Sequence, residues 1–216
     1  MKTLTAFFRP HSIEIQDPPF TKFIFGNTGF SIVWLFVRVW LGWQWVSAAS
    51  HKLFLSDDAG NTLWGQINPA WMVTGAALKG YWTNAVSIDP KPVIYFDWYR
   101  DFIQMLLDAQ AYVWFAKLIA LGELFIGIAL IIGLFTGIAA FFGAFMNWNF
   151  LMAGTASSNP MLFVLALLLV LAWKNAGYIG LDRWVLPLLG TPWKVGYLIS
   201  PPKPETPQSK PQPVRA

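Results

Sequence analysis

Four apolar segments, each close to the length of a membrane span, constrain the fold of this chain more than any other feature. A helix that crosses the roughly 30 Å hydrocarbon layer needs about 20 mostly apolar residues. The segments cover about residues 29–50, 111–133, 137–154 and 160–179. Only 12% of the 216 residues are charged, which is about half the share found in soluble domains. We therefore predict an all-α integral membrane protein, a bundle of four transmembrane helices.

The other residues divide into two terminal segments and one long loop. Residues 1–28 form an N-terminal segment that is too long and too polar for a cleavable signal peptide. Residues 29–180 form the four-helix membrane domain, whose loop, residues 51–110, contains short amphipathic helices expected to lie in the membrane interface. Residues 181–216 give an amphipathic segment and then a Pro/Lys-rich tail that we expect to be disordered.

The distribution of positive charge predicts the orientation of the bundle. Three Lys or Arg residues precede the first span and six follow from Lys174 onward, whereas four lie in the long loop. Positive residues accumulate on the cytoplasmic side of a membrane. We therefore predict a multi-pass protein of the plasma membrane with both termini in the cytoplasm and the long loop outside.

The composition excludes several kinds of redox centre. The chain contains no cysteine, and its two histidines are His11 and His51. Disulfides, iron–sulfur clusters and covalently attached haem all need cysteine. We predict no metal or haem site in this chain, and the scattered net charge of +4 does not suggest binding to nucleic acid.

Three polar residues on three spans are predicted to lie near the middle of the membrane. Counted at about 1.5 Å per residue from the inner ends of the spans, Arg38 lies at about 13 Å, and Glu123 and Asn147 at about 15 Å. Ionisable groups at such depth are costly and indicate function by default. Two interpretations stay open: a clasp that only fixes helix packing, or a cavity in which Arg38 donates to a quinone carbonyl and Glu123 orients Arg38 or carries a proton.

Four further residues extend this cluster. Trp45 lies on the same helical stripe as the arginine, and Asn149 continues the asparagine site toward the outer leaflet, so both are predicted to help bind the cofactor. His51 and Lys52 end the first span at the outer interface, where they are candidates to receive an anionic substrate or to shuttle a proton. The alternative for this last pair is a simple interface anchor.

Four motifs together resemble those of a known family. They are Arg38-x-x-x-Gly42-Trp-x-Trp45, the Gly-Glu-x-x-x-Gly run within 121–136, Asn147-Trp-Asn-Phe150, and the closing Gly180-Leu-Asp-Arg183. In these the chain is similar to the DoxX/DoxD family of small four-helix membrane proteins.

The resemblance implies a membrane subunit of a quinone-linked oxidoreductase. In the DoxD branch this is the large subunit of thiosulfate:quinone oxidoreductase, which passes electrons from thiosulfate to membrane quinone together with a DoxA subunit. The implied partners are therefore the lipid bilayer, quinone as the electron acceptor, and a separate DoxA-like subunit or a larger redox complex. The alternative is a non-catalytic accessory or scaffold subunit, and a third option, a small transporter, is disfavoured by four unbroken spans without an inverted repeat.

Overall fold

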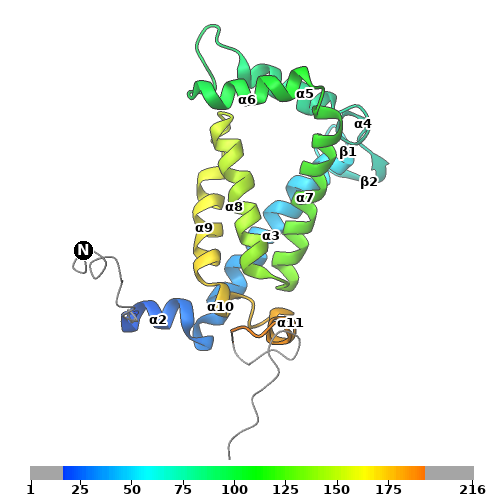
Figure 1. Cartoon of the computed structure of the whole chain (residues 1–216). Helices are drawn as coiled ribbons and strands as arrows, with labels where there is room; N and C mark the ends of the chain where they lie inside the picture. Colours follow the sequence, from blue (N-terminus) through cyan, green and yellow to red (C-terminus); the bar gives the residue numbers. More distant parts are fainter. Residues whose placement is uncertain (1–16, 193–216) are drawn as a thin grey trace, which may run out of the picture.

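The computed structural model describes residues 17–192, so most of the predicted N-terminal segment and the Pro/Lys-rich tail lie outside the described residues. Within this range the protein is a bundle of long helices with shorter elements lying across both ends (Figure 1). The long helices occupy the four apolar segments, and the last of them continues into the short helix α10 (Trp173–Ala176). They are α3 (Ser31–Leu53), α7 (Tyr112–Ile132), α8 (Thr136–Met152) and α9 (Asn159–Leu171).

Two of these helices are long and apolar enough to cross a membrane by themselves. The first is α3 together with the preceding turn η1 (Thr28–Phe30), and the second is α7. The helices α8 and α9 are shorter, with 17 and 13 residues. The structure therefore supports a helical membrane protein. The lengths of α8 and α9 leave the prediction of four complete spans unconfirmed.

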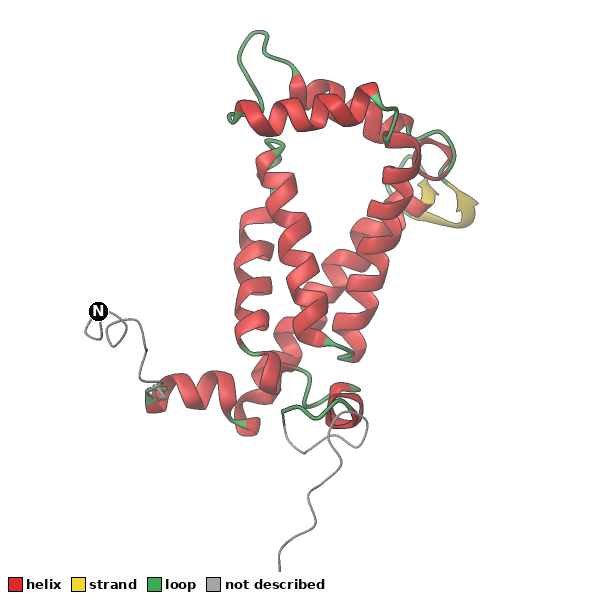
Figure 2. Cartoon of the chain, viewed as in Figure 1, coloured by secondary structure: helices red, strands yellow, loops and turns green. Residues whose placement is uncertain are grey.

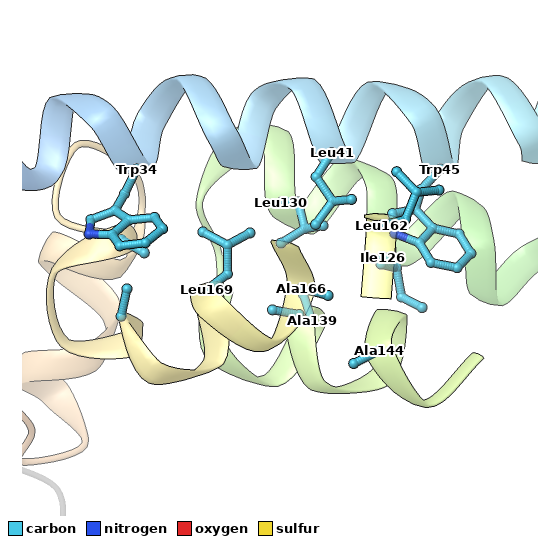
Figure 3. Packing of buried hydrophobic residues seen from close by; sticks show 13 residues of the cluster. Trp34, Leu41, Trp45, Ile126, Leu130, Ala139, Ala144, Leu162, Ala166 and Leu169 are labelled. Atoms are coloured by element: carbon cyan, nitrogen blue, oxygen red, sulfur yellow. The ribbon is translucent and has the colours of Figure 1, made fainter. Parts of the chain in front are cut away.

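The bundle is built from two closely packed pairs, α3 with α7 and α8 with α9. The first pair approaches most closely where Gly42 faces Gly127, because a Cβ atom on Gly42 would lie 2.7 Å from the Gly127 carbonyl oxygen. Small residues permit such backbone contacts between membrane helices. From α3, the side chains of Trp34, Leu41 and Trp45 project into the core between the pairs (Figure 3).

Helices α7 and α8 form an antiparallel hairpin around a corner of three residues, 133–135. Gly133 ends α7 in the left-handed conformation, with φ of 70°, which glycine adopts without steric cost. The spans predicted at 111–133 and 137–154 leave only residues 134–136 between them, so this tight corner agrees with the sequence. It holds the two helices together at one end of the bundle (Figure 1).

Residues 54–111, which we call the end layer, lie across the opposite end of the bundle (Figure 1). They have a hydrophobic cluster of their own around Leu78, Trp82 and Ile103. As the sequence indicates for this loop, the layer contains amphipathic helices. Its elements are β1 (Phe54–Ser56), β2 (Thr62–Ile67), α4 (Pro69–Met72), α5 (Ala76–Val86) and α6 (Asp97–Asp108).

The antiparallel hairpin of β1 and β2 was not expected from the sequence (Figure 2). Its strands have only three and six residues, too few for a clear alternation of apolar and polar positions. The turn is stabilised by Asp57, whose carboxylate accepts hydrogen bonds from the backbone N–H of Asn61 at 2.7 Å and from its side chain at 3.0 Å. These hydrogen bonds lower the pKa of Asp57.

Two short helices lie at the end of the bundle that carries the α7–α8 corner, α2 (Pro19–Gly26) and α11 (Asp182–Leu188). Helix α2 is attached to the bundle by hydrogen bonds that bundle side chains donate to backbone carbonyl groups near the end of α2. Trp34 Nε1 donates to the Ile24 carbonyl at 2.8 Å, and Asn175 Nδ2 donates to the carbonyls of Ile24 and Asn27 at 3.0 and 2.9 Å. The amide nitrogen of the buried Asn175 thereby connects α2 to the bundle.

We expect Gly42→Ala to lower the thermal stability of the protein, because the added methyl group forces α3 away from α7. Overpacking of this kind costs about 1–3 kcal/mol. The matched control is Gly80→Ala within α5, where a Cβ atom meets no described atom within 4 Å. That variant should gain about 0.5–1 kcal/mol from the better helix propensity of alanine. Thermal unfolding in one detergent checks both, and equal stability of the two variants contradicts the close contact.

Candidate functional site

The charged pair inside the bundle joins Lys52 to Glu123. Lys52 Nζ lies 2.6 Å from Glu123 Oε2, and the glutamate side chain is only 1% exposed. The lysine side chain turns back along α3, where Nζ donates to the Ala48 carbonyl at 3.4 Å. Nζ also lies 5.4 Å from the centre of the Trp71 ring in α4, a cation–π distance. The pair therefore sits directly below the end layer.

Arg38 and Glu123 do not contact each other. The prediction that Arg38 clusters with Glu123 and Asn147 is therefore wrong for Arg38. The two residues lie on opposite sides of the Gly42–Gly127 contact, each four residues from it along its helix. At about 1.5 Å per residue they are about 12 Å apart along the bundle. The depth count assumed that α3 and α7 end in the same plane, whereas α3 extends past the α7–α8 corner.

Arg38 instead binds the carbonyl end of α7. Its Nη1 donates to the carbonyls of Leu130 at 2.6 Å and Ile131 at 2.7 Å, and its Nη2 donates to the carbonyl of Ile179. The last carbonyl groups of a helix have no partner within the helix and carry partial negative charge. A buried guanidinium satisfies them, so this contact assigns Arg38 to holding the α7–α8 corner.

Asp182 performs the complementary task at the start of α8. The carboxylate is fully buried and accepts hydrogen bonds from the backbone N–H groups of Phe135 at 2.6 Å and Thr136 at 2.9 Å. Asp182 is the first residue of α11, yet its side chain caps α8. A carboxylate at a helix N-terminus satisfies unpaired donors and complements the helix dipole.

Glycines make room for both of these charged side chains. A Cβ atom on Gly133 would lie 2.8 Å from Arg38 Cζ, one on Gly180 would lie 3.0 Å from Arg38 Nη2, and one on Gly177 would overlap the Asp182 carboxylate. We call Arg38, Asp182 and these three glycines the corner clamp. The clamp explains Gly180 and Asp182 of the Gly180-Leu-Asp-Arg motif without any catalytic role.

Asn147 and Trp45 are the buried polar groups that the fold leaves unsatisfied beside the charged pair. Asn147 is fully buried and Trp45 is 3% exposed. Both amide atoms of Asn147, Nδ2 and Oδ1, and the indole Nε1 of Trp45 find no hydrogen-bond partner among the described residues. Unsatisfied buried polar atoms cost about 1–3 kcal/mol each, so they commonly indicate a function or a bound molecule.

These two groups lie within about one helical turn of the level of Glu123. A Cβ atom on Gly143 would lie 3.2 Å from Trp45 Nε1 and 3.5 Å from Ile126 Cγ2, so three helices meet at this point. Glu123 and Asn147 lie three and four residues beyond it, both toward the end layer. We call Trp45, Lys52, Glu123 and Asn147 the buried polar site (the indole of Trp45 is seen in Figure 3).

The other predicted site residues lie outside this group. Asn149 turns away from the core: its Oδ1 accepts a hydrogen bond from the Tyr99 hydroxyl of α6 at 3.0 Å, and its Nδ2 donates to Phe145 at 2.8 Å. His51 is exposed, and its Nδ1 lies 3.2 Å from Ser56 Oγ in the end layer. Thus Asn149 and His51 connect the bundle to the end layer. In residues 17–192 no group of three His, Asp or Glu side chains is placed to hold a metal ion.

Comparison with known proteins finds a family that the central part of the chain resembles. Residues 91–156 match the DoxX family. The resemblance to DoxX is thereby confirmed over α6, α7 and α8, which carry Glu123 and Asn147. Together with the two long apolar helices, the match indicates a membrane protein. No curated protein and no solved structure matches the chain.

Sequence reasoning missed the partners within this DoxX-like bundle rather than the polar residues themselves. Lys52 lies on the same stripe as Arg38, and its long side chain points toward the N-terminus of its helix, as helical side chains do. That direction is the signal that could have paired Lys52 with Glu123. No local signal links Trp71 or Asp182 to the residues they contact, since both are distant in sequence.

We expect Arg38→Met to destabilise the protein by about 3–5 kcal/mol, because the change leaves the carbonyl end of α7 and the Asp182 carboxylate without the cation. The expected result is a lower yield of folded protein and a lower melting temperature. Lys203→Met, which removes a positive charge distant in sequence, serves as the control. A stable Arg38→Met protein that has lost only activity contradicts the corner clamp.

The end layer should loosen at alkaline pH. Burial raises the pKa of Tyr99 to about 12, with a smaller contribution from Tyr81, so the folded state favours the neutral phenol. This contribution is complete below the unfolded pKa of about 10 and is lost as the pH rises toward about 12. Near-UV circular dichroism from about pH 9 to 12 checks this loss. Tyr99→Phe should reduce it, and an unchanged alkaline transition in that variant argues against the assignment.

Proposed function

We propose that this protein is the membrane subunit of a quinone-linked oxidoreductase and that the buried polar site binds the quinone headgroup. The observation that carries this proposal is that both amide atoms of Asn147 and the indole N–H of Trp45 are buried without a hydrogen-bond partner among the described residues. The DoxX match supports the same class of function.

The hydrogen-bonding capacities of these two residues suit a quinone. A quinone presents carbonyl oxygens that accept hydrogen bonds, and a quinol presents hydroxyl groups that also donate. The indole of Trp45 is a donor only, whereas the Asn147 amide both donates and accepts. The pair can therefore hydrogen-bond the headgroup in its oxidised and its reduced form.

The charged pair supplies proton chemistry at the same level of the bundle. Quinone provides two-electron redox chemistry in which two protons are taken up for each quinol formed. Glu123 is buried beside Lys52, and the lysine side chain is 19% exposed. We assign Glu123 to holding a proton near the headgroup and Lys52 to connecting it with the end-layer side.

Thiosulfate is the proposed electron donor, on the resemblance to the DoxD branch alone. His51 and Lys52 remain the proposed point of approach for this anion, with a DoxA-like subunit as the proposed partner. Because the Lys52 ammonium group is already paired with the Glu123 carboxylate, we expect this chain alone to bind thiosulfate weakly.

The proposed topology has four spans with both termini in the cytoplasm of the plasma membrane. Helices α9 and α10 together extend from Asn159 to Ala176, which brings this segment close to spanning length. In this arrangement the end layer lies outside the cell and the corner clamp lies near the cytoplasmic surface.

A scaffold subunit of a larger redox complex is the second candidate. The observation that favours it is the number of large side chains exposed on the end layer, among them Trp64 at 73% and Tyr95 at 86%. Exposed apolar surface of this kind commonly marks protein contacts. Copurification of a respiratory complex, without quinone binding by the chain itself, would favour this candidate.

We expect Asn147→Leu to weaken binding of decylubiquinone by about tenfold, which corresponds to about 1.4 kcal/mol. The thermal stability without ligand should stay equal or rise, because the change removes an unsatisfied buried amide. Equilibrium binding to the purified protein in nanodiscs provides the measurement.

A matched pair of tryptophan variants controls this experiment. Trp45→Phe removes the buried N–H donor and should also weaken binding, whereas Trp43→Phe changes a side chain of the same helix that is 62% exposed and should bind normally. Wild-type affinity in both the Asn147→Leu and the Trp45→Phe variant would show that the headgroup does not bind at this site.

A further inference from the structure

We propose that quinone reaches the buried polar site sideways from the membrane, between α7 and α8, through a portal closed by Met146 over Gly122. This inference rests on the proposed quinone site. It adds the route of access and names the two residues that control it.

The two portal residues stand next to the site. Gly122 and Met146 immediately precede Glu123 and Asn147, so they lie at the same level of the bundle but about 100° around their helices. Both are partly buried, between the fully buried site residues and the exposed outer face. They therefore form the wall that separates the site from the membrane.

This wall is thin. A Cβ atom on Gly122 would meet Met146 Sδ at 3.8 Å and, in the described chain outside the α7 backbone, no other atom within 4 Å. A methionine side chain has three rotatable bonds and adapts its shape readily. One change of Met146 rotamer, opposite a residue without a side chain, opens the seam without moving a helix.

The two seams that flank it, α3–α7 and α8–α9, belong to the closely packed helix pairs of the bundle. Between α3 and α7, a Cβ atom on Gly127 would lie 2.7 Å from Val46 Cγ2 and 2.8 Å from the Gly42 carbonyl oxygen. Inside the bundle, Leu41 of α3 and Leu169 of α9 are fully buried in the core (Figure 3). Helices α7 and α8 are instead joined at their corner and diverge toward the end layer (Figure 1).

The outer face of the portal has the chemistry that a tailed quinone needs. Phe125 lies about one turn below Gly122 and is 66% exposed, and Phe142 lies about one turn below Met146 and is 53% exposed. These rings offer an apolar aromatic surface along which an isoprenoid tail can remain in lipid while the headgroup enters.

Rapid-mixing kinetics tests the portal, with the protein in nanodiscs and decylubiquinone as the probe. Gly122→Leu should slow both association and dissociation by about tenfold, equivalent to about 1.4 kcal/mol at the barrier, and leave the dissociation constant unchanged. Met146→Ala should accelerate both rates. Met161→Ala on α9 is the matched control, since that methionine is 52% exposed and distant from the seam in sequence; its rates should equal those of the wild type.

The possible results separate the two proposals. Unchanged rates in Met146→Ala overturn the portal even if Gly122→Leu does not fold. A changed dissociation constant with an unchanged association rate also overturns it, because Gly122 and Met146 would then belong to the binding site. If the wild-type protein binds no decylubiquinone, the proposed quinone site falls and the portal falls with it.

Discussion

The corner between α7 and α8 depends on two buried charges, and the rest of the bundle depends on that corner. In an apolar environment the free carbonyls of one helix end and the free N–H groups of the next must find partners within the protein. Arg38 serves the carbonyls and Asp182 the N–H groups. Because these residues come from α3 and from the start of α11, the clamp joins the beginning, middle and end of the described chain.

Once the corner is fixed, the bundle can contain a less favourable polar site at its other end. There the close Gly42–Gly127 contact holds α3 against α7, and the neutralised pair of Lys52 and Glu123 lies beside the unsatisfied amide of Asn147. Local departures from full hydrogen bonding, such as the amide of Asn147, are what a binding site built into a stable scaffold shows. The two buried charges thus have different partners, since Arg38 binds backbone carbonyls at the corner and Glu123 pairs with the Lys52 side chain.

The polar residues of the site were predictable one at a time, but their partners were not. Glu123 and Asn147 stand out in the sequence because they interrupt apolar helices, and Trp45 was predicted because it lies on the stripe of Arg38. The structure places the three within about one helical turn of the same level. Arg38 stands out for the same reason, yet it lies about 12 Å away, by helical rise, at the corner. The depth of a residue counted along one helix says nothing about how far that helix is offset along its axis from its neighbour.

The sequence by itself determined the helical, membrane-like character of the chain, the positions of its long helices, the tight α7–α8 connection and the DoxX resemblance. Each of these follows from local patterns: apolar length, glycine at a turn, and short motifs. Only the tertiary structure decided that Lys52 pairs with Glu123, that Asp182 caps α8, and that a short β-hairpin stands in the end layer. These features depend on helix offset and on contacts between distant residues, and the repeat of a single helix carries no information about either.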